Sequence, residues 1–211
     1  MEKGADRRMI KKIFDMDNPL MQGLSTAAYL MILNLLAMVC CLPVFTAGAS
    51  LTALHDVIRD MVRHEETYPA KMFFDSFKKN LRAGSRMGLI FIAAAVLILA
   101  NYYAAAAFLP AFRFISLALG IVLLAVSFWA FALLARFENT VRGTLRNAIL
   151  LTAGYFPRTA GMTAFTVIFY LAALKYTAVI APVAIMFGFS LPVYVCTILL
   201  NGILEKMEAG N

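Results

Sequence analysis

Two long runs without charge place the strongest constraint on this chain. Residues Gly88–Phe112 and Phe114–Ala135 contain no Asp, Glu, Lys or Arg, and each has room for the ~20 apolar residues that a membrane-spanning helix needs. Within a bilayer only helices and closed β-barrels satisfy their backbone hydrogen bonds, and the strict alternation of barrel strands is missing here. Of the 211 residues, 62% are apolar and 15% charged, whereas soluble domains have about 45–50% and 25%. We therefore expect an all-α, polytopic membrane helical bundle.

The hydropathy pattern predicts five membrane spans in all, two of which contain the uncharged runs above. Apolar stretches predict spans at residues 22–42, 87–109, 114–135, 159–177 and 179–203. A sixth stretch, 45–63, is ambiguous because its first half is apolar and its second half carries His55, Asp56, Arg59, Asp60 and Arg63. It is either a full span or a re-entrant hairpin, so we expect about six membrane segments arranged as three hairpins.

The positions of the basic residues favour a chain that turns at Pro43–Gly48 and comes back. With this return, seventeen of the nineteen Lys and Arg residues lie on one side and only Arg113 and Lys175 lie on the other. Without this return, the Lys and Arg residues divide at best into twelve on one side of the membrane and seven on the other. Short cytoplasmic loops carry an excess of Lys and Arg, so the return is favoured. It places the turn at the outer side and both termini in the cytoplasm.

The chain is predicted to form one transmembrane domain over residues 1–211, with basic cytoplasmic segments at 1–21, 64–86 and 136–158. In the second, Pro69 suits the first turn of a helix, and Phe73, Phe77 and Leu81 recur every four residues. This stripe indicates a helix lying either in the membrane interface or against the protein's own spans. The candidate residues for cytoplasmic docking or contact with anionic lipids are Lys71, Lys78, Lys79, Arg82, Arg142 and Arg146.

Polar residues and helix breakers in apolar runs are the candidates for a substrate path. The set is Pro43, Gly48, Asp56, Asn34 and Asn101. Ionisable and polar groups in a span can mark such a path, although interhelical hydrogen bonds are their ordinary role. Asp56 and the charges after it can instead anchor the helix at the cytoplasmic interface. Gly188 and Pro192 predict a kink in the last span.

We find no motif for chemistry. The His64–Glu66 sequence lacks the second His of a zinc-protease helix, and His55 and Asp56 point in different helical directions, so they do not complete a triad with Ser50. No metal, cofactor or catalytic residue is therefore expected, and the protein is expected not to be an enzyme. The net charge of +7 is explained by the cytoplasmic loops, so no nucleic-acid partner is expected.

Several motifs resemble those of the YesL-like family of bacterial membrane proteins, a family defined by a domain of unknown function. They are FDMDNPL (Phe14–Leu20), LPVFTAGASLTAL (Leu42–Leu54), FFDSFKKN (Phe73–Asn80), RFENTVRGTLRNA (Arg136–Ala148) and FPRT (Phe156–Thr159). One departure follows Leu54, where His55 and Asp56 replace an expected aromatic pair. Genes of this family often lie beside ABC-type sugar importers.

The resemblance implies an accessory or partner subunit of a carbohydrate uptake system in the inner (cytoplasmic) membrane of a bacterium. Its partners would be membrane lipids and the permease subunits of a sugar ABC importer. The alternative is a stand-alone transporter or channel for small solutes, in which Gly48 and Asp56 would line the path.

Overall fold

The computed structural model describes residues 19–63, 68–108, 111–137, 140–176, 182–183 and 185–209. Within these ranges the chain is all-α, with eight helices of which one is a short 3-10 helix. The expected fold class is therefore confirmed. The basic segment 1–21 lies almost entirely outside the described residues, as do FDMDNPL up to Asn18 and the chain end at 210–211.

Helices α2 (Pro19–Cys41) and α3 (Ala47–Val62) form the predicted hairpin, connected through the 3-10 helix η1 (Val44–Thr46). Pro43 precedes η1 with extended backbone, and its ring cannot continue the hydrogen bonding of α2. The Thr46 hydroxyl donates to the carbonyl of Cys40 at 2.7 Å, and the Ser50 hydroxyl donates to that of Ala37 at 3.1 Å. These bonds clamp the turn, so the chain does reverse direction where the charge distribution required it.

The hairpin packs on α4 (Pro69–Phe108) through three glycines. A Cβ atom added to Gly88 would lie 2.6 Å from the Cα of Gly48, and one added to Gly84 would lie 2.7 Å from the Cα of Ala49. Such contact between backbones is possible only between residues with small side chains. The glycines therefore place the start of α3 beside residues 84–88, where α4 changes from basic to apolar, and not at the far end of the apolar half as expected for an outer turn.

Helix α4 is continuous for 40 residues, so the expected boundary between a cytoplasmic segment ending at residue 86 and a span starting at 87 is not a break in the backbone. Its first half packs on the protein itself. Phe73 is fully buried in a cluster that includes Leu54 and Ile58 of α3, and its ring stacks on Phe77 at 6.3 Å. Phe73 and the half-buried Phe77 therefore face the protein's own helices, whereas Leu81 is 38% exposed.

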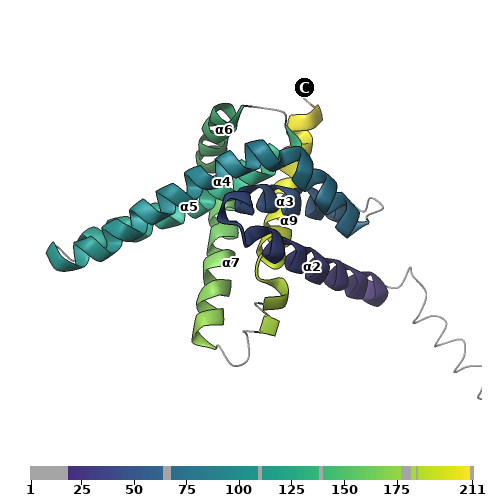
Figure 1. Cartoon of the computed structure of the whole chain (residues 1–211), viewed down its shortest axis with the longest axis horizontal. Helices are drawn as coiled ribbons and strands as arrows, with labels where there is room; N and C mark the ends of the chain where they lie inside the picture. Colours follow the sequence, from purple (N-terminus) through teal and green to yellow (C-terminus); the bar gives the residue numbers. More distant parts are fainter. Residues whose placement is uncertain are drawn as a thin grey trace, which may run out of the picture.

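Helix α5 (Ala111–Arg136) returns along the apolar half of α4, and Figure 1 shows the two extending together beyond the rest of the molecule. Helices α6 (Val141–Gly154), α7 (Phe156–Lys175) and α9 (Ser190–Ala209) follow. α7 runs away from this pair, and α3 lies at the centre, in contact with α2, α4, α5 and α9. The larger core cluster gathers around Trp129 of α5, which is fully buried.

Three helical stretches are long and apolar enough to cross a membrane: Met21–Cys41, Pro69–Ala104 and Arg113–Arg136. They indicate a multi-pass membrane protein. Ser190–Ile203 is apolar but shorter. Helix α3 has 16 residues with charges toward its end, and α7 carries several threonines, so neither meets the same criterion. Three membrane segments are thus shown by length and composition, and six stay a prediction.

Candidate functional site

Asn34 of α2 binds the backbone at the break in the last apolar segment. Its Oδ1 accepts hydrogen bonds from the backbone N–H groups of Phe189 at 2.8 Å and Ser190 at 3.2 Å. Its Nδ2 donates to the carbonyl of Ile185 at 2.8 Å. The side chain is fully buried. Because the first N–H groups of a helix have no partner within it, Asn34 supplies the acceptor that α9 needs at its start.

The break itself is a turn at residues 188–189, directly before α9. The Tyr170 hydroxyl of α7 donates to the carbonyl of Gly188 at 2.8 Å. The interruption predicted from Gly188 and Pro192 therefore exists, and four described backbone groups around it are bonded to side chains of α2 and α7. Asn34 acts here as an internal cap.

Asp56 of α3 also bonds inside the protein. Its Oδ2 accepts a hydrogen bond of 2.7 Å from the Ser76 hydroxyl of α4, and the Asn80 side chain donates to the same hydroxyl at 3.3 Å. His55, one residue earlier, is buried and meets the Phe128 ring edge-on at 6.4 Å between centroids. Arg59 is 3% exposed. The charged end of α3 is thus packed between helices, where it joins α3 to the first half of α4.

The five candidates for a substrate path do not meet at one place. Asn34 lies at the start of α9, Gly48 lies in the crossing with α4, and Asp56 lies two turns further along α3. Pro43 is exposed in the turn, and Asn101 is exposed on the apolar half of α4. The structure therefore distributes these residues over separate packing contacts and the molecular surface.

The six basic candidates for docking are all exposed. Four of them are on the first half of α4 and two on α6: Lys71, Lys78, Lys79, Arg82, Arg142 and Arg146. The N-cap of α6 is Thr140, whose side chain accepts from the backbone N–H of Gly143 at 3.2 Å. Such a cap fixes where the helix begins, and Arg142 and Arg146 lie about one turn apart on its exposed side.

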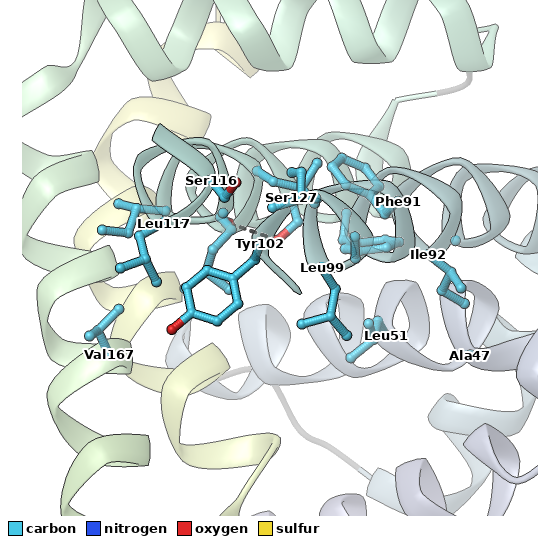
Figure 2. Close-up of a pocket in the computed structure, with 18 of the residues that line it drawn as sticks. Ala47, Leu51, Phe91, Ile92, Leu99, Tyr102, Ser116, Leu117, Ser127 and Val167 are labelled. Atoms are coloured by element: carbon cyan, nitrogen blue, oxygen red, sulfur yellow. Dashed lines mark hydrogen bonds between the residues drawn. The ribbon is translucent and has the colours of Figure 1, made fainter. Parts of the chain in front are cut away.

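A groove of about 780 Å³ lies where α3, α4, α5 and α7 meet. Its walls are apolar, with Leu51 on α3, Phe91 and Leu99 on α4 and Leu117 on α5 (Figure 2). Gly120 of α5 also lines it, and a Cβ atom there would meet nothing within 4 Å. The sequence analysis did not predict this groove, because no local pattern reveals a space between four helices.

Tyr102 and Arg113 lie at one end of the groove. The Tyr102 ring lines it, and the guanidinium carbon of Arg113 lies 5.7 Å from the centre of that ring. This distance is typical of a cation–π contact. Ser127 also lines the groove, but its hydroxyl donates to the carbonyl of Leu124 at 2.7 Å. Arg113 was notable in the sequence only as one of two basic residues on the outer side.

Gly84 and Gly88 were also missed, although a signal for them exists. They are four residues apart, which is the small-xxx-small spacing of close helix contacts in membranes. As for chemistry, no group of three or more His, Cys, Asp or Glu side chains with metal-site geometry occurs in the described part of the chain. Cys40, Cys41 and Cys196 are free thiols.

Comparison with protein-family models gives a match over part of the chain. Residues 28–102 match the family model described as "Protein of unknown function, DUF624". The matched region includes most of α2, all of α3 and most of α4, and thus both glycine contacts and the Asp56–Ser76 bond. No curated protein and no solved structure matches the chain.

Proposed function

We propose that this protein is a non-enzymatic membrane subunit that associates with the permease subunits of an ABC-type carbohydrate importer. The proposal rests on the hydrogen bonds that two of the polar candidate residues make inside the bundle. Asn34 bonds to the start of α9 and Asp56 accepts from Ser76. Polar groups used in this way hold helices together, and they favour a structural role over a lined path for solutes.

The outward surfaces support association with other membrane proteins. The paired helices α4 and α5 extend beyond the rest of the molecule (Figure 1), and they carry exposed large apolar side chains such as Leu97 (71% exposed) and Phe114 (75% exposed). Exposed cations occupy the other half of α4. A partner could thus contact apolar helices within the bilayer and basic side chains beside it.

The carbohydrate part of the proposal rests on the resemblance to the YesL-like family. Two of the motifs that carry it, Leu42–Leu54 and Phe73–Asn80, lie inside the residues that match the family model. These motifs form the turn, the start of α3 and the face of α4 that packs on it. They therefore support an architecture shared with that family. The partner is suggested separately, by the sugar importer genes that often lie beside the genes of the family.

The test is co-purification from membranes in a mild detergent. The tagged full-length protein is co-expressed with the permease subunits of the sugar importer encoded nearest to its gene, and the retained subunits are identified by mass spectrometry. We expect the permease subunits to be retained. Replacing Lys78 and Arg82 together with Glu should weaken retention, because both are exposed and reversal of charge opposes an acidic partner surface.

The matched control is Lys175→Glu, which reverses an exposed cation at the end of α7, outside the proposed docking set. It should leave retention unchanged. If the permease subunits are never retained or crosslinked, even with the unaltered protein, the proposed association is wrong.

A stand-alone transporter is the second candidate, and the break at residues 188–189 favours it, because interrupted helices form the binding sites of many transporters. The purified protein is reconstituted alone into vesicles and tested for uptake of labelled sugars and ions. We expect no uptake. Uptake that is abolished by Asp56→Asn, in a variant that stays folded, would replace the subunit proposal with this one.

A further inference from the structure

We propose that the apolar groove binds one acyl chain of an anionic phospholipid, with the phosphate group of that lipid at Arg113. This site goes beyond the proposed association with a permease and does not depend on it. It uses the groove residues of α4 and α5 together with the cation at the start of α5.

The position of the groove determines the class of ligand. Two of its walls belong to α4 and α5, which are both long and apolar enough to cross a membrane. Within the bilayer the surrounding medium is hydrocarbon. An empty space of about 780 Å³ would forfeit the dispersion contacts of every atom that lines it. An acyl chain restores those contacts and needs no hydrogen-bonding partner from the walls.

The length of the groove suits such a chain. Its lining residues on α4 extend from Gly88 to Tyr102, and this stretch of helix rises about 21 Å at 1.5 Å per residue. One leaflet contributes about half of a hydrocarbon core of ~30 Å. A lipid anchored at the Tyr102 end can therefore lay its whole chain along α4 and reach toward the contact between Gly48 and Gly88.

The charge at one end selects the headgroup. Arg113 is exposed and lies over the Tyr102 ring, so its guanidinium is held beside the groove while its N–H groups stay available to a ligand. Guanidinium groups bind phosphate through paired, charge-assisted hydrogen bonds. In a zwitterionic lipid the ammonium group of the headgroup neutralises the phosphate and weakens its attraction to Arg113. An anionic lipid has no such ammonium group, so its phosphate should bind Arg113 more strongly.

The experiment uses the purified full-length protein in phosphatidylcholine vesicles that contain a minor fraction of phosphatidylglycerol. The phosphatidylglycerol carries a photoactivatable diazirine on one acyl chain, and labelled peptides are mapped by mass spectrometry. We expect labelling concentrated on groove residues such as Leu99 and Leu117. Val96 and Ile115 are 58% and 53% exposed and lie outside the groove, so they should be labelled much less.

Two variants that fill the groove test the site. Gly120→Leu places a side chain in open space and should reduce labelling of the groove about tenfold, since it displaces roughly two methylene groups of the acyl chain. The matched control is Gly161→Leu on α7, where a Cβ atom also meets nothing within 4 Å but which lies outside the groove. If Gly120→Leu fails to fold, Ala95→Phe fills the groove from the α4 side.

Arg113→Gln tests the headgroup. It should reduce the preference for phosphatidylglycerol over an equally labelled phosphatidylcholine about fivefold, the effect of one partly exposed charge pair. Equal labelling of groove and outer faces, or no loss with a folded groove-filling variant, would overturn the site. Crosslinking of the groove to a co-purified protein in place of lipid would overturn it as well. An unchanged preference in Arg113→Gln would overturn the assignment of the headgroup.

Discussion

The side-chain oxygen of Asn34 accepts a hydrogen bond of 2.8 Å from the backbone N–H of Phe189, a residue 155 positions away in the sequence. This bond joins the first apolar helix to the start of the last one. Both residues belong to stretches that look like independent membrane segments in the sequence. Their contact makes the hairpin of α2 and α3 and the helix α9 parts of one packed unit.

Replacing Asn34 with Leu should reduce the free energy of unfolding by about 2 kcal/mol, since the substitution removes its three hydrogen bonds to the backbone and leaves backbone groups of the break unsatisfied. We would measure this as a lower midpoint of thermal unfolding in detergent. Asn101→Leu is the matched control, because Asn101 is exposed on α4. Equal midpoints for the two variants would contradict the role of Asn34 as a cap for α9.

Replacing glycine with alanine should lower stability where α3 crosses α4 and raise it where the glycine faces open space. Gly48→Ala should destabilise the protein by about 3 kcal/mol, because the new methyl group meets the backbone of α4, which cannot move aside as a flexible side chain can. Gly161→Ala, with nothing near its Cβ position, should stabilise by about 0.5–1 kcal/mol through reduced backbone entropy of the unfolded chain. The yield of monodisperse protein and its unfolding midpoint report both effects. A tolerated Gly48→Ala would show that α3 and α4 are not in backbone contact.

Asp56 should tolerate Asn better than Ala. An Asn side chain keeps an acceptor for the Ser76 hydroxyl, so we expect a loss of less than about 1 kcal/mol for Asp56→Asn, whereas Asp56→Ala removes a hydrogen bond to a charged group and should cost about 1.5–3 kcal/mol. Denaturant titration of the purified variants separates the two. Ser76→Ala serves as the reciprocal variant, and no effect from it would show that the bond adds nothing to stability.

The single tryptophan of the chain gives a local spectroscopic test. Trp129 is fully buried, and its Nε1–H donates to the Thr159 hydroxyl at 3.0 Å. Thr159→Val keeps the shape but removes the acceptor, so we expect a blue shift of the fluorescence emission and a loss of about 1–3 kcal/mol, the cost of a buried donor without a partner. Thr152→Val is the control, since the Thr152 hydroxyl donates to the carbonyl of Ala148 in its own helix. Unchanged emission in Thr159→Val would contradict the Trp129–Thr159 contact.

Several local features were predictable because their causes are local. The absence of charge between Gly88 and Phe112 predicted a long apolar helix, and the structure has it as the second half of α4. Pro43 predicted the end of α2, and Gly188 the interruption before α9. The expected position of the turn was wrong in one respect. It lies beside Gly84 and Gly88. The close packing of small residues, and not the distribution of charges, determines which residues of α3 and α4 are in contact.

The sequence by itself determined that this protein is helical, that it contains stretches suited to a membrane and that the chain is interrupted at Pro43 and near Gly188. These properties depend on each residue and its near neighbours, through hydropathy, capping and the limits that proline and glycine place on the backbone. Only the tertiary structure decided that Asn34 caps α9, that Gly48 meets Gly88 and that four helices leave a groove ending at Tyr102. Such contacts depend on which helix faces meet, and residues far apart in the chain come together only when the whole bundle has packed.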